Sequence, residues 1–225
     1  MSKTDKPIDF IIDYETLSAR PDCVILDVAV IPFVNDFQNL PTFNELIESG
    51  LNIKLQISSQ RAIGRSVCSS TLDFWKKQDN AAKVILKPTP HDVELYEAHD
   101  KIKEFLYKSG VMYNKSHGWC RGFFDFPIFA DVMSKQFETT HSQPYEIITQ
   151  GKMREIRSVI EAHLGVRNKT VCPLPKGSLP NFIHHNSLHD CAKDVLMLLY
   201  AQRYAYGIEE VPSYENTEPV TAVAY

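Results

Sequence analysis

The chain has 225 residues, of which 44% are apolar and 23% are charged, and its net charge is −4 with a pI near 6.1. This length and apolar content suit one well-packed domain, which we expect over residues 1–210, followed by a loosely ordered tail over residues 211–225. The mild acidity excludes a uniformly basic surface. Any contact with nucleic acid must therefore come from a local patch.

The five cysteines are scattered, odd in number and without paired metal-ligand spacing. This pattern favours reduced, buried thiols over a disulfide framework or a zinc site. No basic start followed by an apolar segment is present, and no apolar run approaches the roughly 18 residues of a membrane helix. We therefore expect no membrane association and a cytoplasmic location.

Hydrophobic patterning predicts strands first and then alternating helices and strands. Residues 51–57 alternate apolar and polar side chains, as a half-exposed strand does. Residues 70–73 have the spacing of a capping box at the start of a helix. In chain order we expect strands at 8–16, 23–33 and 51–57, a helix from about 70, a helix at 92–109, a strand at 117–121, and helices at 125–137, 153–164 and 190–207. The expected fold is α/β, with a mixed central sheet that contains an antiparallel three-strand meander and is flanked by helices.

The first strand ends in Asp13-Tyr14-Glu15. Side chains at i and i+2 of a strand share a face, so Asp13 and Glu15 project together. Two like charges at the end of a buried strand repel each other, and a divalent cation between them relieves the repulsion. The alternative is that the pair marks the point where a strand leaves the core for solvent.

Asp125 and Asp194 each lie where a strand or loop gives way to a helix. Backbone amides can hold a carboxylate there, as a metal ligand or as a simple N-cap. His189 precedes Asp194 by five residues, so the two would diverge by about 140° if both were helical. We therefore expect His189 in the loop before the last helix, Asp190 as its cap, and Asp194 in its first turns.

These acids and the histidine resemble the exonuclease motifs of the DnaQ-like superfamily, whose fold is ribonuclease H-like. The DEDDh branch, which includes a phage exonuclease similar to this chain, is named for four acids and a histidine. The resemblance is carried by Asp13-Tyr14-Glu15-Thr16, Gly122-Phe123-Phe124-Asp125 and His189-x-x-x-x-Asp194. Two features depart from it: only Phe123 separates Gly122 from Phe124-Asp125, and Glu155 stands where relatives carry Asp.

The resemblance implies a phosphodiester hydrolase that releases nucleoside 5′-monophosphates from the 3′ end of a polynucleotide. Four carboxylates can hold two Mg²⁺ or Mn²⁺ ions about 3.5–4 Å apart, one activating water and one stabilising the leaving oxygen. In this scheme Asp13 bridges both ions, Glu15 and Asp194 complete one site, and Asp125 supports the other. His189 takes the proton from the attacking water.

The partner expected from this resemblance is the 3′ end of a single-stranded nucleic acid. Aromatic side chains such as Trp75 and Phe123 stack on bases, although at helical spacing such residues more often belong to the core. Tyr14 and Thr16 flank the acids and are candidates to meet the terminal nucleotide. Arg121 and Lys176 are candidate phosphate contacts, the alternative being solvated surface charge.

A 3′-5′ exodeoxyribonuclease acting on single-stranded DNA is the leading hypothesis. An exoribonuclease with the same DEDDh site is the alternative, because no residue pattern decides whether a 2′-hydroxyl is accepted. A non-catalytic nucleic-acid-binding module is a rival from another class. If the chain is phage-encoded, the expected location is the host cytoplasm.

Overall fold

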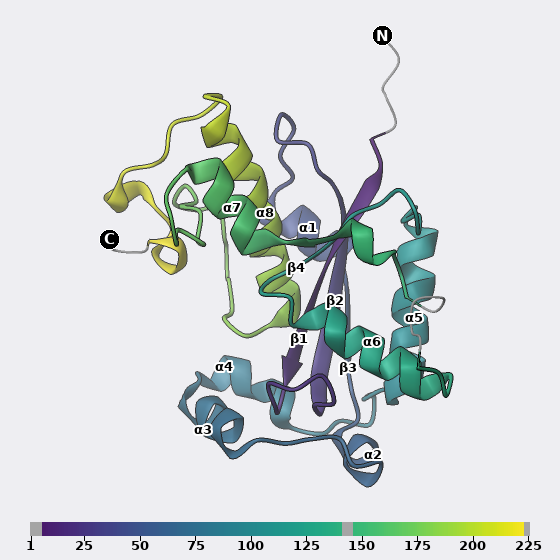
Figure 1. Ribbon diagram of the computed structural model, residues 1–225. Coiled ribbons are helices and arrows are strands. Elements are labelled where there is room, and N and C mark those ends of the chain that lie inside the picture. The colour runs from purple at the N-terminus through teal and green to yellow at the C-terminus, as the bar shows by residue number, and fades with distance from the viewer. Residues whose placement is uncertain (1–5, 141–145, 223–225) are drawn as a thin grey trace.

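A mixed five-stranded sheet in the order β3-β2-β1-β4-β5 forms the centre of the protein. The computed structural model describes residues 6–140 and 146–222, and Figure 1 shows the sheet crossing the middle of the molecule. Its strands are β1 Ile8–Thr16, β2 Ile25–Val34, β3 Leu51–Lys54, β4 Gly118–Cys120 and β5 Met153–Glu155. β1, β2 and β3 pair antiparallel, whereas β4 runs parallel to both β1 and β5. The predicted α/β class, mixed sheet and three-strand antiparallel meander are confirmed.

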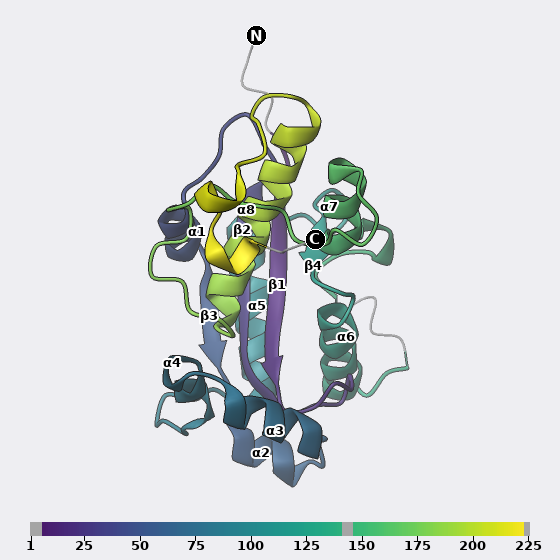
Figure 2. The ribbon, with the colours of Figure 1, turned by 90° about the vertical axis from the view of Figure 1, so that its left-hand side faces the viewer.

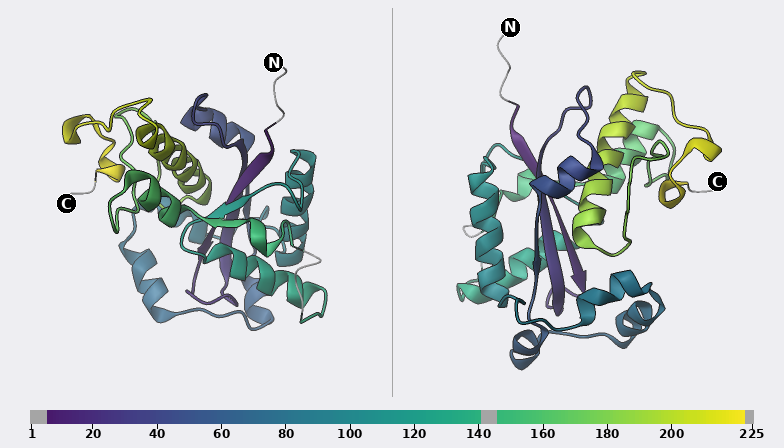
Figure 3. Two further views of the ribbon diagram at one scale, coloured as in Figure 1. Left: turned by 45° about the horizontal axis from the view of Figure 1, so that its top comes forward. Right: turned by 180° about the vertical axis from the view of Figure 1, so that it is seen from behind.

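Helices cover both faces of the sheet because β1 alternates the direction of its apolar side chains. Phe10, Ile12 and Tyr14 face one core with α5 and α6, whereas Ile11 faces a second core with α1, α7 and α8. Figures 2 and 3 show α8 running alongside β1, with α5 on the far side of the strands. The helices are α1 Phe43–Ser49, α2 Ile57–Ala62, α3 Ser69–Lys77, α4 Asn80–Lys83, α5 Leu95–Lys108, α6 Asp125–Gln136, α7 Ile156–Leu164 and α8 Ser187–Ala205.

Besides the start of the last helix, three predictions about the elements are wrong. The third strand ends at Lys54, and Ile57 instead begins α2. Residues 153–155 were expected in a helix but form the edge strand β5. The expected capping box at residues 70–73 is absent, since α3 is preceded by Cys68 and has no side-chain cap. Cys68 is partly exposed, whereas the other four free cysteines are buried.

Residues 211–222 differ from the loose tail that the sequence suggested. They contain two short 3-10 helices, Tyr214–Asn216 and Pro219–Thr221. Glu218 is the main attachment, because its backbone N–H donates to the Leu174 carbonyl at 2.8 Å and its carboxylate accepts from the Gly177 N–H at 2.6 Å. This segment is therefore fixed to the loop that carries Lys176, and the limit of the domain at residue 210 stays a prediction.

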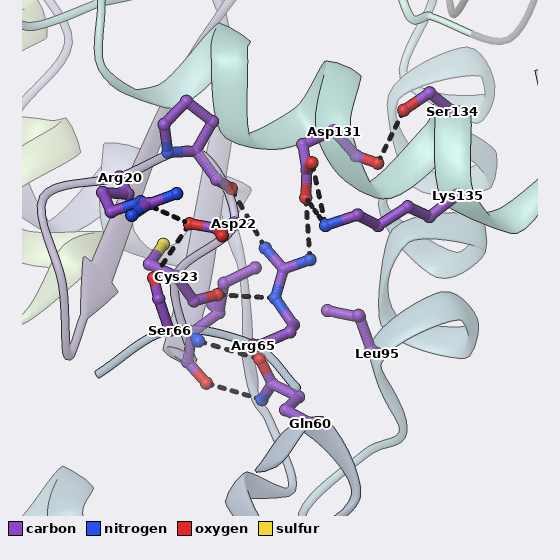
Figure 4. A network of polar contacts seen from close by, with 12 residues as sticks. Arg20, Asp22, Cys23, Gln60, Arg65, Ser66, Leu95, Asp131, Ser134 and Lys135 are labelled. Carbon is purple, nitrogen blue, oxygen red and sulfur yellow. Dashed lines mark hydrogen bonds and ion pairs between the residues drawn. The ribbon is translucent and has the colours of Figure 1, made fainter. Parts of the chain in front are cut away.

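Arg65 ties the β1–β2 turn to α6. Its guanidinium donates to the carbonyl oxygens of Pro21 and Cys23 and lies 2.9 Å from the Asp131 carboxylate (Figure 4). The Arg65 side chain is 1% exposed. Because Asp131 belongs to α6, which begins at Asp125, this network fixes α6 relative to the end of β1.

Arg65→Met is expected to lower the free energy of unfolding by about 3 kcal/mol, because it removes one partner of a buried ion pair and leaves two carbonyls without a donor. Urea denaturation measures the loss. Lys135→Met is the matched control, since Lys135 pairs with the same carboxylate but is 46% exposed. Its effect should stay below about 1 kcal/mol. Equal losses for the two variants would contradict a special role of Arg65.

Candidate active site

Four predicted acids come together from three elements. Asp13 and Glu15 project from β1, Asp125 is the first residue of α6, and Asp194 lies on α8. The Asp125 carboxylate accepts a hydrogen bond from the Tyr14 N–H at 3.1 Å, which fixes it against the strand that carries the first two acids. Burial, followed by the charges of Asp125, Glu15, Asp190 and Asp194, raises the pKa of Asp13 well above its ordinary value.

The cluster has more negative charge than its basic neighbours neutralise. Burial raises the pKa of Asp125 to about 8, with a further contribution from Asp194. Burial also raises the pKa of Asp194, although the charges of Arg121 and Lys193 oppose the shift. Arg121 lies 3.0 Å from the Asp194 carboxylate. Buried carboxylates whose pKa values rise in this way bind hard divalent cations well, because a cation removes the repulsion.

The loop before Asp125 explains the shortened spacing of this motif. Gly122 and Phe123 both have positive φ, 82° and 55°, so two successive residues turn the chain sharply into α6. Glu155 supports this turn by accepting the Gly122 N–H at 3.0 Å, and it also caps α7 through the Arg157 and Ser158 N–H groups. Although burial alone would raise the pKa of Glu155, its hydrogen bonds lower it. The role of Glu155, which sequence reasoning left open, is therefore to hold the turn.

The expected placement of His189 needs correction. α8 begins at Ser187, and the Asn186 side chain rather than Asp190 caps it by accepting the His189 N–H. His189 is therefore helical, and about 140° separates it from Asp194 around the helix. Its ring lies 5.4 Å from the Phe43 ring, and its Nδ1 accepts the Ile183 N–H. In this conformation His189 does not join the four acids.

His185 is the histidine that lies beside the acids, and sequence reasoning missed it. Its Nδ1 is 3.6 Å from the Glu15 carboxylate. Together with Asp190, these two residues offer ligand atoms that lie within 4.8 Å of one another. The available signal was its position directly before Asn186 at the start of α8, but His184 precedes it directly and no spacing distinguishes the two.

Three of the predicted substrate contacts are inside the protein. Tyr14 is 4% exposed, and its hydroxyl hydrogen-bonds the buried His99. Trp75 is 2% exposed and donates to the Thr16 carbonyl, so neither face of its ring can stack on a base. The Thr16 hydroxyl donates to the Ser18 carbonyl. Trp75 is therefore a core residue, the alternative given above, and the Tyr14 and Thr16 side chains make buried hydrogen bonds within the protein.

The other three predicted contacts are placed differently. Phe123 is 57% exposed beside Asp125, which suits a stacking platform at the site. Arg121 lies at the acids but is engaged by Asp194 and by the Thr170 carbonyl. Lys176 is exposed on the loop fixed by the C-terminal segment, and its backbone N–H donates to Asn216. In the described part of the chain, no contact of Lys176 with the four acids is found.

The Tyr14–His99 pair predicts a pH dependence of stability. Burial lowers the pKa of His99 from 6.5 to about 4. The unfolded state therefore binds more protons between these values, and stability falls as the pH drops through this range. Between pH 7 and pH 5 the loss from His99 is about 2 kcal/mol. Urea denaturation of His99→Gln should show a smaller loss of stability between pH 7 and pH 5 than the wild type, and an equal loss would contradict the prediction.

Comparison with known proteins identifies the family of the chain. The model of the 3′-5′ exoribonuclease Rv2179c-like domain family matches residues 9–201. The chain belongs to this family. The exodeoxyribonuclease of Enterobacteria phage T4 is 39% identical over 224 residues, which cover 95% of this chain and 97% of the relative. The chain is thus an exonuclease, as the resemblance implied.

Solved structures of E. coli exonuclease I share the fold of this family member. A zinc-bound complex with single-stranded DNA matches with a TM-score of 0.51 at 12% identity, covering 92% of this chain. A complex with a dT13 oligonucleotide matches with a TM-score of 0.52 at 12% identity, covering 88% of this chain. This chain spans 42% and 41% of those two chains. The predicted ribonuclease H-like fold is confirmed.

Proposed function

We propose that this exonuclease hydrolyses single-stranded DNA from the 3′ end and releases nucleoside 5′-monophosphates. The observation that carries the proposal is the gathering of Asp13, Glu15, Asp125 and Asp194 at one site. The name of the T4 relative supports DNA as the substrate, and the complexes of exonuclease I with DNA support a single strand.

The four acids fit a pair of divalent cations, Mg²⁺ or Mn²⁺. Their donor atoms are carboxylate oxygens, which both ions prefer, and their raised pKa values indicate uncompensated negative charge. Asp13 would bridge the two ions, Glu15 and Asp194 would complete one site, and Asp125 would support the other. When bound, such ions activate water for attack on the phosphorus atom and stabilise the leaving 3′-oxygen.

The remaining steps belong to side chains around the acids. We propose that His189 takes the proton from the attacking water, for which its ring must release the Ile183 N–H and leave the Phe43 ring. Burial lowers the pKa of His189, which keeps the ring neutral and able to accept a proton near pH 7. Exposed Phe123 is a platform for a base near the 3′ end.

Arg121 and Lys176 are the proposed phosphate contacts. Arg121 already lies at Asp194, where ion binding by that carboxylate would free its guanidinium for a phosphate. Lys176 would contact a phosphate further along the bound nucleic-acid strand.

Product analysis on single-stranded DNA tests this function. With the label at the 5′ end, Mg²⁺ should produce a ladder that shortens stepwise, whereas a 3′ label should appear at once as a mononucleotide. EDTA should stop both reactions. Release of the 5′ label as a mononucleotide would reverse the assigned direction, and EDTA-resistant digestion would reject the divalent-ion mechanism.

An exoribonuclease remains the second candidate, because the matching family is described by that activity. RNA and DNA oligonucleotides of the same sequence, digested side by side, separate the two. Faster digestion of RNA would identify RNA, rather than DNA, as the preferred substrate.

No helix in the described ranges 6–140 and 146–222 is long and apolar enough to cross a membrane. Since its T4 relative is a phage protein, we propose that the exonuclease acts in the cytoplasm of a phage host.

A further inference from the structure

Asp27 is a buried carboxylate beside the site to which the proposed reaction gives no role. It lies on β2 directly opposite Glu15 of β1, and it is 3% exposed. Directly opposed residues of an antiparallel pair project from the same face of the sheet. Asp27 therefore shares the face of Glu15 and Asp13, which is also the face that α8 covers.

One oxygen of Asp27 connects this face to the start of α8. Oδ2 accepts a hydrogen bond from the Asn52 side-chain amide at 3.0 Å. The same amide nitrogen donates to the Ser187 hydroxyl at 2.8 Å. Ser187 is fully buried and is the first residue of α8, the helix that carries His189 and Asp194. Asp27 thus contributes to placing that helix against β2 and β3.

The other oxygen, Oδ1, is buried without a hydrogen-bond partner in the described part of the chain. A buried acceptor left unsatisfied destabilises the folded state, and more strongly when it is charged. A donor from outside the chain removes this cost. A hydrated divalent cation at the neighbouring Glu15 brings such donors, because Mg²⁺ retains several of its water molecules when it binds to carboxylates.

We propose that Asp27 holds the hydrated divalent ion at Glu15, with its free Oδ1 accepting a hydrogen bond from the ion's hydration water. The inference rests on the divalent-ion site of the proposed function. Asp27 is then a positioning residue, because one oxygen orients the ion's water and the other orients the start of α8 through Asn52 and Ser187. Ion binding and the placement of α8 are coupled through a single side chain.

Asp27→Asn tests the proposal, because it keeps the size of the side chain and removes its charge. Titration calorimetry with Mn²⁺ on the full chain should show a dissociation constant that is 10- to 100-fold weaker than that of the wild type, as for other residues that orient metal sites. Thermal unfolding in EDTA should show no loss of stability, since the amide keeps an acceptor for Asn52 and removes the unpartnered carboxylate oxygen. If Asp27→Asn does not fold, Asp27→Ser is measured in the same way.

Asp9→Asn is the matched control. Asp9 is 2% exposed on the same sheet, but it accepts hydrogen bonds from the His117 N–H and the Trp119 indole instead of facing the acids. This variant should be less stable in EDTA and should bind Mn²⁺ like the wild type.

Wild-type affinity for Mn²⁺ in Asp27→Asn would overturn the inference, and so would a loss of stability in EDTA with no change in affinity. Failure of the proposed function is distinguishable from both results. If the proposed function were wrong, the wild type would bind no Mn²⁺, or Asp13→Asn would bind Mn²⁺ as tightly as the wild type.

Discussion

Asp13→Asn is expected to lower the rate of nucleotide release by about 10³-fold or more and to leave a folded protein. The ions are expected to contribute several kcal/mol to the stabilisation of the transition state, and each 1.36 kcal/mol is tenfold in rate. Burial and the charges of four neighbouring carboxylates raise the pKa of Asp13, which is the proposed bridge between the ions. Rates on a labelled single strand with saturating Mg²⁺ measure the loss.

Although Asp13→Asn lowers the rate, it should not lower the stability of the metal-free protein. Without divalent ions a charge on Asp13 would be buried among Asp125, Glu15, Asp190 and Asp194, and a neutral side chain avoids this repulsion. The unfolding temperature in EDTA should therefore equal or exceed that of the wild type, while the increase on adding Mg²⁺ should shrink. Near wild-type turnover would remove Asp13 from the mechanism, and unfolding in EDTA would instead make it a structural residue.

The second large effect is expected at His189. His189→Ala should lower kcat by about 10²–10⁴-fold, the usual contribution of a general base, and should leave the affinity for Mn²⁺ unchanged. His185→Ala is the matched comparison, because His185 comes from the same segment and touches Glu15 directly. We expect less than a tenfold loss of kcat for His185→Ala.

The two variants distinguish the histidine that the family motif indicates from the histidine that lies at the acids in the structure. The family motif points to His189, whereas the present conformation places His185 at the acids and His189 against Phe43. A large loss in His185→Ala together with a small loss in His189→Ala would assign the base to His185. Rates measured at saturating substrate and metal exclude changes of affinity as the cause.

Long periodic elements and acidic motifs were predictable because each is encoded locally. β1 follows from a mainly apolar run around Phe10, Ile11 and Ile12, and α5 from helical spacing that stops at Gly110. The convergence of the acids followed only from the resemblance, since no local pattern brings Asp125 next to Tyr14 across 111 positions. Once the motifs were matched, the sequence sufficed to predict that these four acids are neighbours, while their catalytic role stays a prediction.

The errors concern residues whose burial or secondary structure depends on partners far away in sequence. Trp75 looked like a stacking platform, but the carbonyl of Thr16, 59 positions earlier, satisfies its indole N–H inside the core. Residues 153–155 form an edge strand only because β4 offers a parallel neighbour. The start of α8 was misplaced because Asn186 competes with Asp190 as the cap, and tertiary contacts of Ser187 favour the earlier start.

The uneven exposure of the thiols makes the native protein suitable for site-selective labelling. Cys68 precedes α3 and is partly exposed, and the Ser70 hydroxyl lowers the pKa of its thiol. The four remaining cysteines are enclosed, and for Cys120 and Cys191 burial raises the thiol pKa further. A maleimide fluorophore should therefore attach at Cys68 without mutagenesis, since reactivity follows thiolate content and access. The ring centroids of Phe74, on the helix that follows Cys68, and His185 lie 4.9 Å apart, so this helix borders the site. We therefore expect the fluorescence of a dye on Cys68 to change when an oligonucleotide binds.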